Sequence, residues 1–288
     1  MSFIIDPYLV AAANAAVEAG KAILEIYRSD FTVHRKADRS PLTQADRLSH
    51  DIIVRSLRPF HIPLLSEEGK SFSYRVRRKW HRLWIVDPLD GTKEFVNRNG
   101  EFTVNIALVE HHTPIMGVVY IPIRDLLFFG FQSTGSFKRV DADAFLRSAR
   151  LSPFSGKAVD ALLKTASRLP LEKTGSDAFT IVGSRSHASA ELESFVQTIK
   201  RQKEKVTFIS AGSSMKFCLV AEGSADIYPR FGPTMEWDTA AGQAIAENAG
   251  MCVLDRNTQK PLVYNKENLL NPWFIVQSER MKGTFSFD

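Results

Sequence analysis

Two carboxylates three residues apart follow an apolar run in the first third of the chain. Residues 84–86 are Trp-Ile-Val and predict a buried strand, which Asp87 and Asp90 follow directly. Pro88 cannot donate a ladder hydrogen bond, so we expect the strand to end there. Carboxylates in such a place suit a hard cation such as Mg²⁺, which shares its oxygen ligands with a phosphate. An ordinary turn is the alternative, because Asp, Pro and Gly are common turn residues.

A second pair of acids, Glu67 and Glu68, ends another short apolar run at residues 62–65. Paired glutamates before a glycine are usually part of a solvated loop. An acid delivered from a neighbouring strand end would, however, complete a metal site with Asp87 and Asp90.

Asp46 and Thr92 can serve either structure or chemistry. Thr43 and Asp46 have the spacing of a capping box at the start of a helix expected over residues 43–57, which favours a structural role for Asp46. Thr92 follows Gly91, which permits close backbone approach, and can cap the next helical turn. The outward N–H groups of such a turn suit a phosphate.

Polar and cationic residues also stand at the ends of elements expected in the second half: Ser184, Arg185, Ser186, His187, Ser213, Ser214, Lys216, Arg230 and Asp238. Taken singly, each is better explained as a helix cap, a solvated cation or an acid that complements a helix dipole. Together they place hydroxyls, cations and a carboxylate where functional sites are usually built.

The elements that would position these residues divide the chain into two parts. The first part has an amphipathic helix over residues 7–28 and an antiparallel meander of strands over 102–109, 114–120 and 125–131. Residues 152–178 are rich in Ser, Thr, Lys and Pro and predict a mobile connection, with domains at 1–150 and 151–288. Strands and helices alternate in the second part, which predicts an α/β layer.

Composition narrows the class of protein. The 288 residues are 44% hydrophobic and 24% charged, as in a soluble globular protein, and the net charge of +5 weakly favours an anionic partner. The basic run at 75–82 could be a nucleic-acid or membrane patch. Phe72, Val76 and Trp80 recur there with helical spacing, so a solvated helix face is favoured.

Cys218 and Cys252 lie in apolar segments, which predicts buried free thiols in a reducing compartment. No Cys/His ligand spacing indicates zinc. Neither a signal peptide nor a membrane-spanning run is recognisable, so we expect a cytoplasmic protein.

Three motifs resemble, in order, the signature motifs of the inositol monophosphatase superfamily: Glu67–Glu68, Trp84–Thr92 and Trp237–Gly242. Further segments resemble its 3'(2'),5'-bisphosphate nucleotidase branch: Lys36–Pro41, Gly91–Phe95, Asn99–Thr103, Ser184–His187, Gly212–Phe217 and Tyr228–Arg230. The resemblance covers nearly the whole chain.

The resemblance implies a layered αβαβα sandwich, α+β in its first half and α/β in its second, of the inositol monophosphatase/fructose-1,6-bisphosphatase type. It implies Mg²⁺-dependent hydrolysis of the 3'-phosphate of adenosine 3',5'-bisphosphate, a by-product of sulfate assimilation, to AMP and phosphate. The expected partner is this small nucleotide bisphosphate and not a nucleic acid. An inositol or fructose phosphate phosphatase is the nearest alternative. Oligomeric state and a peripheral position at the inner face of the cell membrane stay open.

The resemblance also implies residue roles. The metal ligands would be Glu67, Asp87, Asp90, Asp238 and the backbone carbonyl of Leu89, and all of these except Asp87 would also contact the substrate. Asp46 and Thr92 would activate the attacking water. The remaining substrate contacts would come from Gly91 and Thr92 at the scissile phosphate, Ser213, Lys216 and Arg230 at the other phosphate and sugar, and His187 near the nucleotide.

Overall fold

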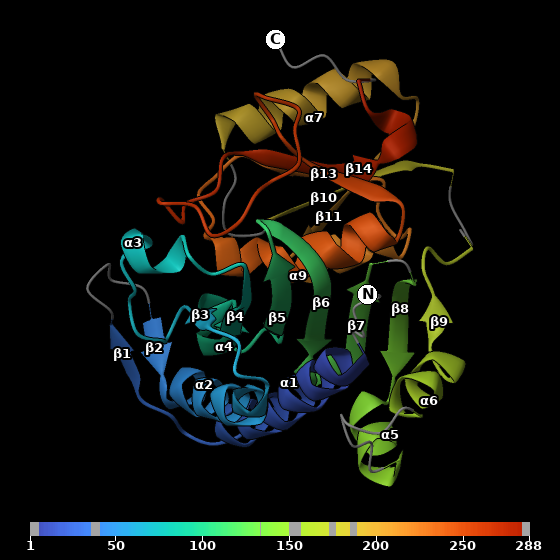
Figure 1. The fold of residues 1–288 in the computed structure, drawn as a ribbon. Helices are drawn as coiled ribbons and strands as arrows, with labels where there is room; N and C mark the ends of the chain where they lie inside the picture. The colour runs from blue at the N-terminus through green and yellow to red at the C-terminus, as the bar shows by residue number, and fades with distance from the viewer. Residues whose placement is uncertain are drawn as a thin grey trace.

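The computed structural model describes residues 6–35, 41–132, 134–149, 157–172, 177–184 and 189–283. Within these ranges the chain forms five layers (Figure 1), in which two sheets alternate with three layers of helices. The helices of the layers are α1 (Asp6–Tyr27) and α2 (Gln44–Leu57) on one outside, α8 (Met215–Ala221) and α9 (Glu236–Asn248) between the sheets, and α7 (Ala190–Gln202) on the other outside. The predicted αβαβα sandwich is therefore confirmed.

The two sheets are built almost entirely from separate halves of the chain. The seven-stranded sheet has the order β3 (Leu64–Ser66), β4 (Arg82–Asp90), β5 (Thr103–Glu110), β6 (Thr113–Ile121), β7 (Leu126–Phe131), β8 (Gly135–Val140) and β9 (Ser167–Arg168). The five-stranded sheet has the order β11 (Val206–Ala211), β10 (Phe179–Ser184), β12 (Ile227–Arg230), β14 (Phe274–Ser278) and β13 (Met251–Asp255). The meander of β5, β6 and β7 is antiparallel, as predicted.

Shorter elements connect these layers: the ribbon β1 (Val33–Arg35) and β2 (Pro41–Thr43), the helices α3 (Tyr74–Arg77), α4 (Thr92–Val96), α5 (Ala142–Ala149) and α6 (Ala158–Lys164), and 3₁₀ turns at Arg58–Phe60, Pro122–Arg124 and Glu279–Met281. The connection predicted over residues 152–178 was wrong in part, because α6 and β9 lie within it. Strand β9 pairs with β8, which places residues 167–168 in the first sheet. Residues 151–156 and 173–176 lie outside the described ranges.

Apolar side chains fill each space between layers. One cluster joins α1 and α2 to the seven-stranded sheet, a second lies between the two sheets around α8 and α9, and a third lies under α7. Helix α9 approaches β6 so closely that a Cβ added at Gly117 would lie 2.3 Å from the carbonyl oxygen of Ala241. Only glycine fits there, and the close approach fixes α9, which carries Asp238, against the first sheet.

Strand β4 does not end at Pro88, as the sequence predicted, but continues to Asp90. Asp87 pairs with Asn105 and Asp90 with Thr103, so the register shifts by one residue between these pairs. Pro88 is tolerated because it lies in this bulge, where its missing N–H is not needed. In a regular strand, residues three apart face opposite sides. The extra residue turns Asp87 and Asp90 toward the same pocket.

The interpretation of residues 75–82 as a solvated helix face holds only in part, because Arg75, Arg78 and Lys79 are exposed whereas Arg77 is not. Helix α3 has only four residues, and the side chain of Arg77 is 3% exposed. Its guanidinium group binds a loop far along the chain, as described below. No local pattern indicates this burial, because both partners must be known before it can be predicted. Among the described helices, none is both long and apolar enough to cross a membrane.

Candidate active site

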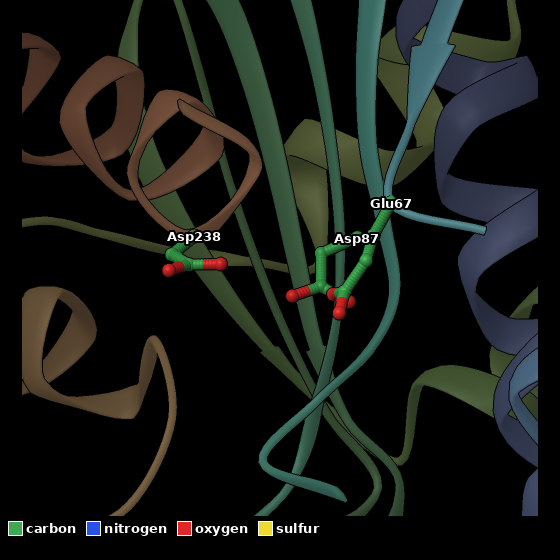
Figure 2. A group of neighbouring side chains, drawn as sticks. All are labelled: Glu67, Asp87 and Asp238. Atoms are coloured by element: carbon green, nitrogen blue, oxygen red, sulfur yellow. The ribbon is translucent and has the colours of Figure 1, made fainter. Parts of the chain in front are cut away.

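Three carboxylates from distant parts of the chain converge between the two sheets (Figure 2). Glu67 follows β3, Asp87 lies in β4, and Asp238 lies in the first turn of α9. Each offers an oxygen within 4.8 Å of the other two. The backbone places Glu67 beside Asp87, because β3 pairs in parallel with β4 and the N–H of Glu67 donates to the carbonyl of Val86 at 3.2 Å.

The cluster strongly disfavours its own negative charge. Burial raises the pKa of Asp87 well above its usual value, and the charges of Glu67, Asp90 and Asp238 raise it further. The pKa of Asp238 is raised in the same way, first by burial and then by Asp90. A divalent cation would relieve both effects, and its preferred ligands are oxygens of this kind. These residues therefore fit a metal ion.

Asp90 is held from one side by hydroxyl and amide groups. Its Oδ2 lies 2.7 Å from Ser214 Oγ and accepts a hydrogen bond from Asn105 Nδ2 at 3.2 Å. Ser214 Oγ also lies 2.7 Å from the carbonyl oxygen of Asp238, and it accepts a bond of 2.9 Å from Asn105. Ser214 thus links the side chain of Asp90 in β4 to the backbone of Asp238 in α9. Asn105 is a polar residue within an apolar strand, and this break in the pattern is the signal in the sequence that points to it.

Asp46 and Thr92 form a second small unit beside the acids. The capping box predicted at α2 is present, because Asp46 Oδ2 accepts bonds of 2.7 Å from both the N–H and the hydroxyl of Thr43. The other oxygen, Oδ1, lies 3.3 Å from the hydroxyl of Thr92. This hydroxyl is also 3.3 Å from the carbonyl of Leu89. Asp46 therefore has a structural role at one oxygen and faces Thr92 with the other.

Two predicted helix caps differ in the structure. Thr92 is the first residue of α4, and Gly91 takes the cap position with φ +91°. Ser214, not Ser213, precedes α8 directly. Ser213 has φ +46°, and its buried hydroxyl has no hydrogen-bond partner among the described residues.

Two cations, Lys216 and Arg230, line the same pocket. Lys216 is 5% exposed and donates to the carbonyls of Ala211 and Ser213. Burial lowers the pKa of Lys216 to about 8, so the Lys216 amine is protonated in most molecules at neutral pH. Arg230 donates through Nη2 to the carbonyl of Pro233 at 2.9 Å, while its buried Nε has no hydrogen-bond partner among the described residues.

The pocket has a volume of about 370 Å³ and gathers twelve of the residues singled out from the sequence: Glu67, Asp87, Leu89, Asp90, Gly91, Thr92, Ser184, Ser213, Ser214, Lys216, Arg230 and Asp238. Asp46 contacts it through Thr92. His187 lies outside the described residues, as do Arg185 and Ser186, whereas Ser184 lines the pocket. The acids of this arrangement can hold a divalent metal, and its cations can hold an anion.

Comparisons with known proteins agree with this geometry. Residues 5–282 match the model of the inositol monophosphatase family. The chain is 44% identical over 266 residues to the 3'(2'),5'-bisphosphate nucleotidase CysQ of Escherichia coli (strain K12), covering 91% of this chain and 96% of that protein. It is 31% identical over 277 residues to the CysQ protein of Haemophilus influenzae, covering 95% and 91% of the two chains.

A solved structure is also similar over nearly its full length. The crystal structure of CysQ from Bacteroides thetaiotaomicron, described as a bacterial member of the inositol monophosphatase family, superposes with a TM-score of 0.84 at 49% identity, covering 96% of this chain and 98% of that one. The chain therefore belongs to the inositol monophosphatase family.

Proposed function

We propose that the protein is a Mg²⁺-dependent phosphatase that removes the 3'-phosphate of adenosine 3',5'-bisphosphate and releases AMP and phosphate. The observation that carries this proposal is a single pocket lined both by the acidic cluster and by the buried cations Lys216 and Arg230. The relatives named as 3'(2'),5'-bisphosphate nucleotidases support the same substrate. Recycling of this nucleotide in sulfate assimilation is the matching cellular role.

The acidic side chains of Glu67, Asp87, Asp90 and Asp238 would hold the metal, and the carbonyl of Leu89 would be a further oxygen ligand. When bound, Mg²⁺ would neutralise charge on the scissile phosphate and the leaving oxygen and lower the pKa of the attacking water. Phosphoryl transfer requires little covalent chemistry from the protein, so positioning and charge neutralisation are its main contributions.

Thr92 and Asp46 would orient the attacking water and take its proton. The Thr92 oxygen can accept a hydrogen bond from the water while its own proton points toward Asp46 Oδ1, 3.3 Å away. Asp46 Oδ2 is fixed by Thr43, which leaves Oδ1 as the proton acceptor in this relay. Gly91 and Thr92 begin α4, and the first N–H groups of a helix have no partner within the helix and suit a phosphate oxygen.

Lys216, Arg230 and Ser213 would bind the 5'-phosphate and the sugar. Arg230 Nε and Ser213 Oγ are buried donors without a hydrogen-bond partner among the described residues. Leaving such donors unpaired costs about 1–3 kcal/mol each, which an anionic ligand would recover. Lys216 adds a point charge, while Arg230 can grip two oxygens at once. A substrate with one phosphate would leave these groups unused.

Four expectations from the sequence stay predictions. They are the role of His187 near the nucleotide, the division of the chain at residue 150, a cytoplasmic location and peripheral membrane attachment.

Side-by-side turnover of two substrates tests the proposal. Phosphate release from adenosine 3',5'-bisphosphate and from inositol 1-phosphate is measured with Mg²⁺ and with EDTA. We expect Mg²⁺-dependent release with a kcat/KM roughly 100-fold higher for the bisphosphate, from two charge-assisted contacts worth about 1.5 kcal/mol or more each. Faster turnover of inositol 1-phosphate, or equal release in EDTA, would contradict the proposal.

A further inference from the structure

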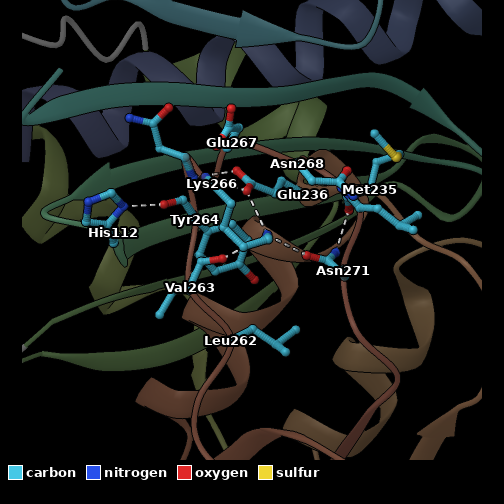
Figure 3. Close-up of polar contacts among 12 residues, drawn as sticks. His112, Met235, Glu236, Leu262, Val263, Tyr264, Lys266, Glu267, Asn268 and Asn271 are labelled. Carbon is cyan, nitrogen blue, oxygen red and sulfur yellow. Dashed lines mark hydrogen bonds and ion pairs between the residues drawn. The ribbon is translucent and has the colours of Figure 1, made fainter. Parts of the chain in front are cut away.

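The first turn of α9 carries Asp238. A buried carboxylate two residues before Asp238, that of Glu236, anchors this turn to a neighbouring loop. The side chain of Glu236 is 0% exposed. Its Oε2 accepts a hydrogen bond of 2.6 Å from the N–H of Asn265, and its Oε1 accepts bonds from the N–H and the amine of Lys266 at 2.9 and 2.7 Å (Figure 3). Such complete pairing is required of a buried charge, and it fixes the position of the helix start.

Asn271 also anchors this turn, through hydrogen bonds to residues on either side of Asp238. Its Nδ2 donates to the carbonyl of Met235 at 2.8 Å and lies 3.0 Å from Thr239 Oγ1. Its Oδ1 accepts a bond of 3.2 Å from the amine of Lys266 (Figure 3). The N–H of Met235 in turn donates to Asp238 Oδ2 at 2.8 Å, so that this oxygen of the acid is part of the same network.

The network reaches the half of the chain that carries Glu67 and Asp87. Buried Arg77 donates through Nη1 to Asn265 Oδ1 at 2.9 Å and to the carbonyl of Lys266 at 3.0 Å. Asn265 Nδ2 donates back to the carbonyl of Arg77 at 2.8 Å. Arg77 lies between Glu67 and Asp87 in the chain. The loop over residues 262–271 thus connects the α9 turn to the first half.

We infer that Glu236 is a positioning residue that holds Asp238 in the metal site, acting with Lys266 and Asn271. The inference rests on the metal site of the proposed function. Without a cation, like charges within 4.8 Å of one another push Asp238 away from Glu67 and Asp87. The fastened turn resists this repulsion and keeps the ligands at a separation that one ion can bridge. Partners behind metal ligands contribute about 10- to 100-fold to metal affinity in other proteins.

The test compares Glu236→Gln with Glu222→Gln. Glu222 is a matched control, because its buried carboxylate also pairs with a lysine, Lys138 at 2.6 Å, but it lies at the C-terminal end of α8, which carries none of the clustered acids. Mn²⁺ binding is measured calorimetrically without substrate, and thermal unfolding is followed in EDTA. Both variants should lose thermal stability. Only Glu236→Gln should weaken Mn²⁺ binding, by about 10-fold or more, whereas Glu222→Gln should stay within about 2-fold of wild type.

Equal Mn²⁺ affinity in Glu236→Gln and wild type would overturn the inference while leaving the metal site intact. Equal weakening in both variants would overturn it as well, since loss of stability alone would then explain the effect. Absence of Mn²⁺ binding to wild type would overturn the metal site itself. Asn271→Ala provides a second measurement if Glu236→Gln does not fold: it should weaken Mn²⁺ binding several-fold, and unchanged affinity would again refute the inference.

Discussion

Replacing Asp87 by Asn should make the metal-free protein more stable and abolish its response to metal. The two side chains have the same shape, and the amide oxygen can still accept the 3.0 Å bond from the N–H of Leu89. What the substitution removes is one negative charge from a buried cluster. Asp87→Asn therefore separates the electrostatic cost of the site from its packing.

The size of the effect follows from the spacing of the cluster. Two unit charges 4.8 Å apart, the upper bound of the separation here, repel by about 0.9 kcal/mol in bulk water and about 3.5 kcal/mol at an effective dielectric of about 20. The two dielectric values bracket the repulsion in the pocket, so we expect a gain in stability of about 1–3 kcal/mol. For a chain of this size each kcal/mol shifts Tm by about 2–4 °C.

The gain in stability of the metal-free Asp87→Asn variant should depend on pH. Because the pKa of Asp87 is raised in the folded state, the metal-free wild type loses stability as pH rises above the unfolded value of about 4 toward that raised pKa. Asn does not titrate, so the advantage of Asp87→Asn should be small near pH 4 and grow at neutral pH. Thermal unfolding in EDTA at several pH values measures this. Repeating it with excess Mg²⁺ should raise the Tm of wild type but not that of Asp87→Asn.

Asp125→Asn serves as the control. Asp125 accepts bonds from the hydroxyl of Tyr120 and the N–H of Asp143, and its φ of +47° is readily adopted by Asn. This variant should keep the Mg²⁺ response of wild type. The reasoning fails if Asp87→Asn is less stable than wild type in EDTA at pH 7. It also fails if Mg²⁺ raises the Tm of Asp87→Asn by as much as it raises the Tm of wild type.

Three further substitutions test other parts of the account. Asp90→Asn should lower kcat at least about 1,000-fold in a folded protein, because an amide nitrogen would replace a metal-facing oxygen; wild-type turnover would remove Asp90 from the site. Arg230→Ala should raise KM for the bisphosphate about 10-fold or more with little change in kcat, and an unchanged KM in steady-state assays would exclude the phosphate contact. Burial raises the pKa of Glu247 to about 7, so Glu247→Gln should stabilise the fold by roughly 1–3 kcal/mol at pH 8 and little at pH 4.5. Equal gains at both pH values in urea titrations would contradict the assigned cause.

Regular elements with strong apolar patterns were predictable. The helix expected over residues 7–28 is α1, and the expected meander is β5–β7, because long periodic segments reveal the face that they bury. Strand β14 was missed, and so was the irregular loop before it, over residues 256–273. Pro88 was misleading, because a bulge can accommodate a proline inside a strand and a sequence does not reveal a bulge.

The site was predictable only to the level of candidate acids. Strand ends identified Asp87, Asp90 and Glu67 locally, but nothing local indicates that the start of α9 meets them between two sheets. Asp238 was singled out at the start of a helix, but only the family resemblance implied that it is a metal ligand. Arg77 shows the remaining limit most clearly: its buried partner Asn265 is 188 residues away, so the local pattern described only a basic run.

Diffraction from crystals soaked in Mn²⁺ would test the central claim most directly, since anomalous scattering locates the ion without assuming a mechanism. The account predicts a peak between the carboxylates of Glu67, Asp87 and Asp238, at roughly 2.0–2.3 Å from an oxygen of each. The peak should be lost in crystals of Asp87→Asn. A fully occupied ion elsewhere in the molecule, with none between these three side chains, would contradict the account.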